Sequence, residues 1–406
     1  MTAFLTHIRD SGAGRPPEQS GARPVSTWAF AGVAITSFGG PLALAALYAP
    51  GIVAGAGAAS AGLSMVAAVV VFAFPLAIWL RYAREINSAG GLYSFVEAAA
   101  GRRVAQVQAG LWIVSYLLYL VYTTAQVVYD TLPAVLPGEV RYQPLLEILI
   151  PVALAGAMIA GRRVTLLVTG LLAAGQLAIA VALDGVTLTH LATPASSFGA
   201  AAPAGALATS AGQTALLYIC GSLPLFLGGE LAHPARTIRR GLTATYLVTA
   251  AVIVAAVAPL AADPALAAEP IPGMTIAARF AGHGFAITVG VGVAASVAGV
   301  MLVEYLALSR LVSAVTAWPS RPVIVGIGAV MVAVAPVTLI NPGAFYNDLL
   351  KPSLVALWLS QLIVFAVFPR FMARRNSRML PVWVLTTVSV AFSVYGLWAV
   401  IQHSST

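Results

Sequence analysis

Glycine, serine and proline interrupt two apolar stretches of this chain, and these interruptions could bind a small ligand through the backbone. They comprise Ser37, Phe38, Gly39, Gly40 and Pro41 in the first stretch, and Gly221, Ser222, Leu223 and Pro224 in the second. A helix in a membrane must satisfy its own backbone groups, so a broken helix is tolerated only where it is buried in protein or lines a cavity. A proline kink without a ligand is the alternative for either interruption alone. Two corresponding interruptions predict one binding site formed by both.

The predicted chemistry of this site follows from the half-helices that each interruption creates. The first amides of a half-helix lack partners and carry a partial positive charge, which attracts an anion. Pro41 and Pro224 suit the first turn of such half-helices, where a missing N–H costs nothing. Carbonyls at the ends of the preceding half-helices favour a cation. A carboxylate beside an ammonium group describes an amino acid zwitterion.

Mostly neutral side chains are expected around that ligand. Tyr116 and Tyr119 are spaced to share one helix face, and Tyr218 and Cys220 come just before the second interruption. Aromatic packing is the alternative role for the tyrosines, and a small buried apolar role is the alternative for the cysteine. The first, third and sixth apolar stretches have no acidic residue near their middles. This favours a neutral amino acid over a dicationic amine.

Two residues of the eighth apolar stretch could bind a coupling ion. An ionisable group inside a membrane is costly and therefore a functional candidate, so Glu304 could carry a proton. A salt bridge to an arginine such as Arg310, or a carboxylate that reaches the membrane surface, is the alternative. Ser296 could ligate sodium together with carbonyls of the first stretch, because a hard cation prefers oxygen ligands. Most serines in such helices only bond their own backbone.

The composition is typical of an all-α polytopic membrane protein, since 60% of the residues are hydrophobic and only 8% are charged. With about 20 apolar residues per span, the sequence predicts eleven helices. Their ranges are 27–50, 57–81, 104–130, 143–160, 164–184, 207–231, 241–261, 285–311, 321–340, 350–370 and 380–402. The fourth is the weakest, because it is short and contains Pro151.

The basic residues predict how these helices are oriented, because cytoplasmic loops hold most of the positive charge. With the N-terminus in the cytoplasm, eighteen basic residues fall inside and only Arg141, Arg279 and Lys351 fall outside. The C-terminus is then extracytoplasmic. This topology explains the net charge of +8 without nucleic acid as a partner. The excess of arginine over lysine suggests a bacterial protein, here a multi-pass protein of the plasma membrane.

The order of the helices predicts an inverted repeat. The first interrupted stretch runs outward and the sixth runs inward, so five helices starting at each would have opposite topology. The predicted parts are a disordered cytoplasmic tail (1–26), a first inverted repeat (27–184), an extracytoplasmic linker (185–206), a second inverted repeat (207–370), and a loop with an eleventh helix (371–406).

Two motifs resemble those of the amino acid, polyamine and organocation transporter superfamily. Residues 88–95 (Ser-Ala-Gly-Gly-Leu-Tyr-Ser-Phe) look like its Gly-Gly-x-Tyr signature after the second helix. Residues 230–238 are similar to the pattern that closes its sixth helix. The resemblance covers about residues 27 to 320, although both interruptions depart from the superfamily's usual motifs. It implies a leucine-transporter-like fold and an amino acid permease.

We therefore predict a secondary transporter that moves an amino acid, in particular a neutral one, by alternating access. Proton or sodium coupling is expected, with no other cofactor, and the expected partners are the substrate and the lipid bilayer. An organic amine or polyamine carrier of the same fold and a non-transporting nutrient sensor are the alternatives. An enzyme is not predicted, because no catalytic residues cluster. No histidine, cysteine or acidic residues have metal-ligand spacing, and no phosphate-binding motif follows a strand.

Overall fold

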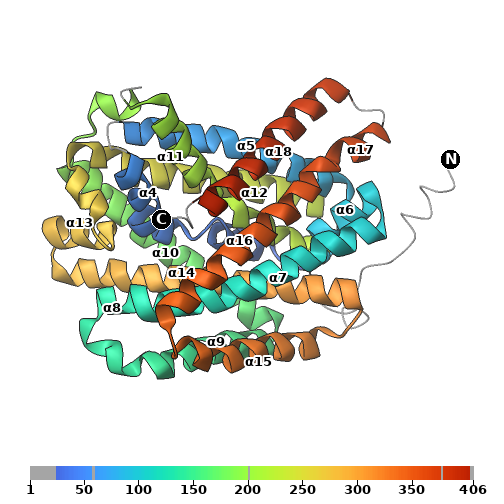
Figure 1. The fold of residues 1–406 in the computed structure, drawn as a ribbon, viewed down its shortest axis with the longest axis horizontal. Coiled ribbons are helices and arrows are strands. Elements are labelled where there is room, and N and C mark those ends of the chain that lie inside the picture. The colour runs from blue at the N-terminus through green and yellow to red at the C-terminus, as the bar shows by residue number, and fades with distance from the viewer. Residues whose placement is uncertain (1–23, 57–59, 200–201, 376–377, 403–406) are drawn as a thin grey trace.

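The computed structural model describes residues 24–56, 60–199, 202–375 and 378–402. Within these ranges the protein is built of helices, and the only β-type pairing is an isolated bridge between Val25 and Leu231 (Figure 1). The all-helical prediction is therefore confirmed for the described residues. The predicted N-terminal tail lies outside them up to residue 23.

Most of the chain forms long helices that run between two ends of the molecule (Figure 1). The uninterrupted ones are α5 (Ala61–Glu85), α7 (Arg102–Gln126), α9 (Gln143–Ile159), α10 (Arg162–His190), α12 (Pro234–Val257), α14 (His283–Thr316), α15 (Ser320–Thr338), α16 (Pro342–Ala366) and α18 (Met379–Gln402). The first interrupted span comprises α2 (Thr27–Ser37), α3 (Pro41–Ala43), the π-helical turn η2 (Leu44–Tyr48) and α4 (Ala49–Ala56). The second comprises α11 (Ala204–Leu216) and the 3-10 helix η7 (Ile219–Glu230). Shorter helices connect them, namely α6 (Leu92–Ala100), α8 (Leu132–Val135), α13 (Pro272–Ala281) and α17 (Phe368–Ala373).

Nine helical segments of the described chain are long and apolar enough to cross a membrane. Two further predicted spans, α9 and the apolar part of α15 (Ser320–Ala335), are shorter. These two helices pack against each other, at the lower edge of Figure 1. The polytopic architecture is therefore supported with nine candidate spans, while the count of eleven and the inverted repeat stay predictions.

Large apolar side chains on the outer helices point away from the protein. On α10 and α18 they include Leu167, Leu171, Val181, Trp383, Val394 and Trp398, each about half exposed or more. A water-soluble protein rarely exposes apolar surface of this extent. Lipid tails solvate such a surface, so these faces fit helices that lie in a bilayer.

The two ends of the helical bundle differ in charge. At one end α5 stops at Glu85 and α7 begins at Arg102, with α6 between them and α17 beside α6 (right in Figure 1). Because consecutive long helices alternate in direction, most described arginines fall at this end, which we call the arginine end. The opposite end carries α8 and α13 (left in Figure 1). Which end faces the cytoplasm stays a prediction.

Helix α10 extends to His190, beyond the end predicted at residue 184, and shortens the predicted linker. Asp184 therefore lies buried within this helix, and His190 stacks on Phe280 instead of lying in a loop. The polar side chains of the last turns are satisfied by the helix itself. The Thr187 hydroxyl, for example, donates to the carbonyl of Leu183 at 2.8 Å. The polar residues of these last turns consequently do not end the helix.

Glycines allow the connection between α5 and α6 to pack closely against η7. A Cβ atom at Gly91 would lie 2.7 Å from the ring of Phe226, and one at Gly229 would lie 3.0 Å from the backbone of Ala89. Gly91 also has a φ angle of +50°, a conformation that favours glycine. The Gly-Gly motif therefore makes a packing contact with the end of the second interrupted span.

We expect Gly91→Ala to destabilise the protein more than the matched substitution Gly101→Ala. Gly101 also has a positive φ, +92°, and both glycines lie outside the regions that alanine favours, so each substitution carries a conformational cost of about 1–3 kcal/mol. No described atom lies within 4 Å of a Cβ at Gly101, whereas the methyl group at Gly91 must displace Phe226. This overpacking should add about 1–3 kcal/mol. Melting temperatures in one detergent measure the difference, and equal values would contradict the packing role.

Candidate functional site

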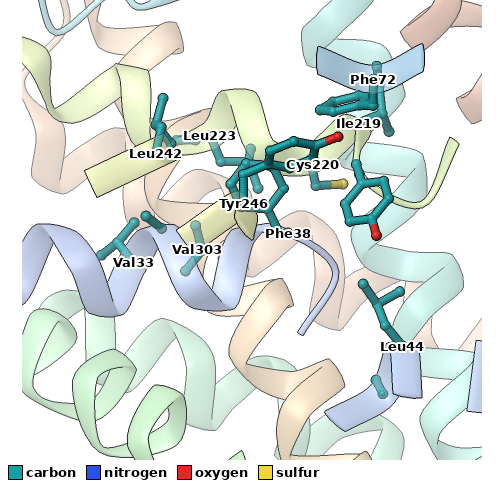
Figure 2. Close-up of a cluster of buried hydrophobic side chains, with 14 of the residues drawn as sticks. Val33, Phe38, Leu44, Phe72, Ile219, Cys220, Leu223, Leu242, Tyr246 and Val303 are labelled. Atoms are coloured by element: carbon teal, nitrogen blue, oxygen red, sulfur yellow. The ribbon is translucent and has the colours of Figure 1, made fainter. Parts of the chain in front are cut away.

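The first interruption is a break in the helical backbone. Helix α2 ends at Ser37, and Gly39 and Gly40 have φ angles of +80° and +70°, which suit glycine alone. Pro41 lies in the first turn of α3, with Gly40 as its N-cap. Figure 2 shows the chain leaving α2 at Phe38 and resuming as a helix near Leu44. The predicted break and the predicted position of its proline are confirmed.

The second interruption differs from the predicted one. Helix α11 already ends at Leu216, and the chain continues as the 3-10 helix η7 over 12 residues. Pro224 therefore lies inside η7, and not in the first turn of an α-helical half as predicted. The tighter turn pairs each N–H with the carbonyl three residues earlier, as Gly221 does with Tyr218 at 2.9 Å. The break thus consists of a change of helix type.

The two interruptions contact each other directly. A Cβ atom at Gly221 would lie 2.3 Å from the ring of Phe38, and one at Gly39 would lie 3.1 Å from the carbonyl oxygen of Leu217. Glycine at position 221 therefore makes room for an aromatic ring of the first interrupted span. This contact fixes the two broken helices side by side.

A cluster of buried aromatic rings surrounds this contact. The ring centroid of Phe38 lies 5.8 Å from that of Tyr246, 6.3 Å from that of Tyr218 and 6.5 Å from that of Phe72. Figure 2 shows Phe38 beside Tyr246. Tyr218, predicted to lie near the ligand, is a member of this cluster and is fully buried. We call these four residues the aromatic cluster.

A cavity of about 290 Å³ lies next to the interruptions. It is lined by Gly39, Leu44, Tyr48, Ser115, Tyr116, Tyr119, Tyr122, Thr123, Gln126, Gln213, Leu216, Leu217, Ile219, Cys220, Val297, Val300, Leu350, Leu354, Leu357, Trp358 and Val400. Its volume is at the lower end of small-molecule pockets, which span roughly 300–1,000 Å³. None of these lining side chains carries a formal charge. The cavity can therefore hold a small ligand among hydroxyl, amide and aromatic groups.

Four of the predicted ligand-binding residues line this cavity. They are Gly39, Tyr116, Tyr119 and Cys220. The others form the wall behind it or the contact between the interruptions, namely Ser37, Phe38, Gly40, Pro41, Tyr218, Gly221, Ser222 and Leu223, all buried or nearly so. Ser37, for instance, donates its hydroxyl hydrogen to the carbonyl of Ala34 at 2.8 Å. Whether these residues bind a ligand stays a prediction.

Several residues of the cavity were not identified from the sequence. Tyr48, beyond the first interruption, donates to the side-chain oxygen of Gln126 at 3.2 Å. Gln213 comes from α11, and Trp358 comes from α16, which packs along α7. A helical wheel could not identify Trp358, because it lies between Leu357 and Leu359 on an apolar helix. Only the packing of α16 on α7 brings Trp358 to this cavity.

Glu304 lies behind the cavity wall and is fully buried. The thiol of Cys220 lies 3.7 Å from its Oε1 atom, and the hydroxyl of Tyr116 lies 3.7 Å from the same sulfur. Its other oxygen, Oε2, has no hydrogen-bond partner among the described residues. Glu304 is thus linked to two residues that line the cavity. The alternative of a salt bridge to Arg310 does not hold, because Arg310 pairs with Glu230.

Ser296 lies beside the first interruption, where its side chain already has partners. It donates its hydroxyl hydrogen to the amide oxygen of Gln176, and the Gln176 amide nitrogen donates to Thr36 at 3.1 Å. The backbone N–H of Ala43, at the start of the second half-helix, donates to the Ser296 hydroxyl at 3.4 Å. Neutral groups thereby join the first interrupted span to α10 and α14 at the break.

A buried ion cluster closes the arginine end next to the second interruption. Glu230, at the end of η7, pairs with Arg162 of α10 at 3.0 Å and with Arg310 of α14 at 2.7 Å. Its carboxyl group is almost fully buried, with a side-chain exposure of 1%. The backbone carbonyl of Glu230 also accepts a hydrogen bond from the N–H of Val25 at 2.9 Å. We call Glu230, Arg162 and Arg310 the ion cluster.

The described residues contain no group of three or more histidine, cysteine or acidic side chains that could hold a metal ion. Neither the protein-family models nor the curated proteins contain a match to this chain.

Proposed function

We propose that this chain is a secondary transporter that moves a neutral amino acid across a membrane by alternating access. The observation that carries the proposal is the contact between two interrupted helices beside a small internal cavity. Interrupted helices at membrane depth occur where backbone groups line a binding site. No catalytic reaction and no cofactor other than a coupling ion is part of the proposal.

The lining of the cavity supports a neutral amino acid as the substrate. An ammonium group can be held by the carbonyls near the interruptions, such as that of Leu217, and by tyrosine rings through cation–π contact. A substrate whose side chain carries a charge would place that charge against uncharged lining groups only. Burying such a charge without a partner is costly. A monocationic amine is the second candidate, because Glu304 lies directly behind Cys220.

The two ends of the cavity support alternating access. Tyr48 lies near the end of the span Thr27–Ile52, and Gln126 lies in the last third of the span Arg102–Val135, so both lie toward the end opposite to the arginine end. On the arginine side, we expect the ion cluster to close the path, because it joins the end of η7 to α10 and α14. Opening that side requires η7 to separate from α10 and α14, which breaks the ion pairs of Glu230. Water entering the opened path would solvate the separated charges.

A ligand screen followed by a flux assay tests the proposal. Purified protein is heated with each amino acid and with common amines, at two pH values and with or without sodium. The expected result is a higher melting temperature with one or a few neutral amino acids. The same compounds should then accumulate in proteoliposomes. Binding without flux would indicate a sensor, and stabilisation only by polyamines would contradict the proposed substrate class.

We expect Val297→Phe to reduce uptake at least about tenfold. Val297 lines the cavity and is 4% exposed, so the larger ring takes space that the substrate needs. The matched control is Val291→Phe on the same helix, because Val291 is 46% exposed on the outer surface. Initial uptake rates, normalised to protein reconstituted, measure the effect. Equal rates for both variants would show that the cavity is not the substrate site.

Bound substrate should protect Cys220, the only cysteine of the chain, from a maleimide reagent. Its thiol lines the cavity, so a ligand there covers it. The rate of modification is followed by intact-protein mass spectrometry with and without the amino acid that stabilises the protein. An amino acid that gives no thermal shift is the control. An unchanged modification rate with the stabilising amino acid would place its binding site elsewhere.

If Glu304 carries the coupling proton, Glu304→Gln should abolish pH-driven accumulation and preserve exchange of substrate across the membrane. The matched control is Glu147→Gln, which changes another buried carboxyl group, located in α9 and bonded to Thr338 of α15. Glutamine can accept the same hydrogen bond, so accumulation should persist in this control. Accumulation and counterflow in proteoliposomes measure the two activities. Normal pH-driven accumulation by Glu304→Gln would exclude the proton role.

A further inference from the structure

A second pocket lies outside the candidate transport site, at the arginine end. It is formed where the last turn of α5 meets the end of α17 and the start of α18, and its volume is about 480 Å³. The lining residues are Arg81, Arg84, Glu85, Met372, Arg375, Arg378 and Pro381. We call it the arginine pocket. A single water takes up only about 30 Å³ of liquid, so the pocket can hold a larger group with its hydration.

The charge of the arginine pocket is strongly positive. Four guanidinium groups face a single carboxylate, Glu85, whose Oε2 atom lies 3.7 Å from the Nε atom of Arg375. No ion pair within the described residues involves Arg81, Arg84 or Arg378. The pocket therefore retains three positive charges without a protein counterion. These charges attract an anion.

One of the four arginines is already held in place. The guanidinium carbon of Arg375 lies 3.7 Å from the ring centroid of Phe371, and its Nη1 atom donates to the carbonyl of the same residue at 3.3 Å. Stacking on the ring leaves the remaining N–H groups of the planar guanidinium free to point sideways. A fixed guanidinium loses less conformational freedom on binding. Arg81 and Arg84 are three residues apart on α5 and reach the same side of the helix.

We propose that the arginine pocket binds a phosphate group, supplied by the headgroup of an anionic membrane lipid. Several guanidinium groups around one site suit a tetrahedral phosphate, because each can form two parallel hydrogen bonds to its oxygens. The pocket lies at the ends of three candidate spans, where lipid headgroups meet the protein. Basic pockets between membrane helices bind anionic headgroups in this way. Met372 and Pro381 supply an apolar side for the glycerol and acyl region.

The test compares three soluble probes with the purified protein in a neutral detergent. Dihexanoyl-phosphatidylglycerol carries a net negative charge, dihexanoyl-phosphatidylcholine has the same chains without it, and inorganic phosphate has no lipid part. We expect a saturable rise in melting temperature with phosphatidylglycerol and none with phosphatidylcholine. An equal response to both lipids would overturn the proposal. A saturable response to inorganic phosphate alone would support the phosphate site and assign it a soluble ligand.

Matched variants separate a specific site from general attraction to positive charge. The double variant Arg84→Gln with Arg378→Gln should raise the apparent dissociation constant of the active probe about tenfold or more. The control, Arg239→Gln with Arg240→Gln, removes the same charge from the exposed first turns of α12, outside the pocket. It should leave the dissociation constant unchanged. Equal losses in both double variants would overturn the proposal. None of these arginines belongs to the candidate transport site, so the result is independent of the proposed function.

Discussion

A backbone amide that leaves water must find another hydrogen-bond partner. In the two interrupted spans, several amides lack the carbonyl partner that a continuous α-helix would supply. At the first interruption, the hydroxyl of Ser296 from α14 accepts the N–H of Ala43, and Gln176 of α10 in turn accepts the hydroxyl hydrogen of Ser296. At the second, the chain tightens into a 3-10 helix and satisfies its own groups. The arrangement of the site depends on these two solutions, because together they keep Phe38 over Gly221 beside the cavity.

The sequence predicted the parts of this arrangement that depend on backbone chemistry. Gly39, Gly40 and Pro41 mark a break because only glycine adopts the required φ angles without strain and proline suits a first turn. The helices were predictable because apolar runs of spanning length have few other conformations available in a membrane. The short helices at the bundle ends were missed, since α6 and α13 lack the length that identifies a span.

What the sequence could not predict depends on contacts between distant residues. The end of α11 at Leu216 coincides with the close approach of Leu217 to Gly39, a contact that the sequence does not reveal. Gln176 looks like one polar residue on an apolar helix, and only its position beside Ser296 and Thr36 identifies it as a bridge. Glu304 was identified as a candidate from its cost in a membrane, but its link to Cys220 requires α14 to pack on η7.

These contacts also distinguish the two candidate positions for a coupling ion. A sodium ion at Ser296 would share the lone pairs of its hydroxyl with the N–H of Ala43, which donates to this oxygen at 3.4 Å, and Ser296 does not line the cavity. A proton on Glu304 displaces nothing, because Oε2 has no partner among the described residues. The carboxyl group is also linked through Cys220 to Tyr116, which lines the cavity, so substrate binding can alter its surroundings. If the chain is the proposed transporter, Glu304 is therefore the coupling candidate with the more direct link to the cavity.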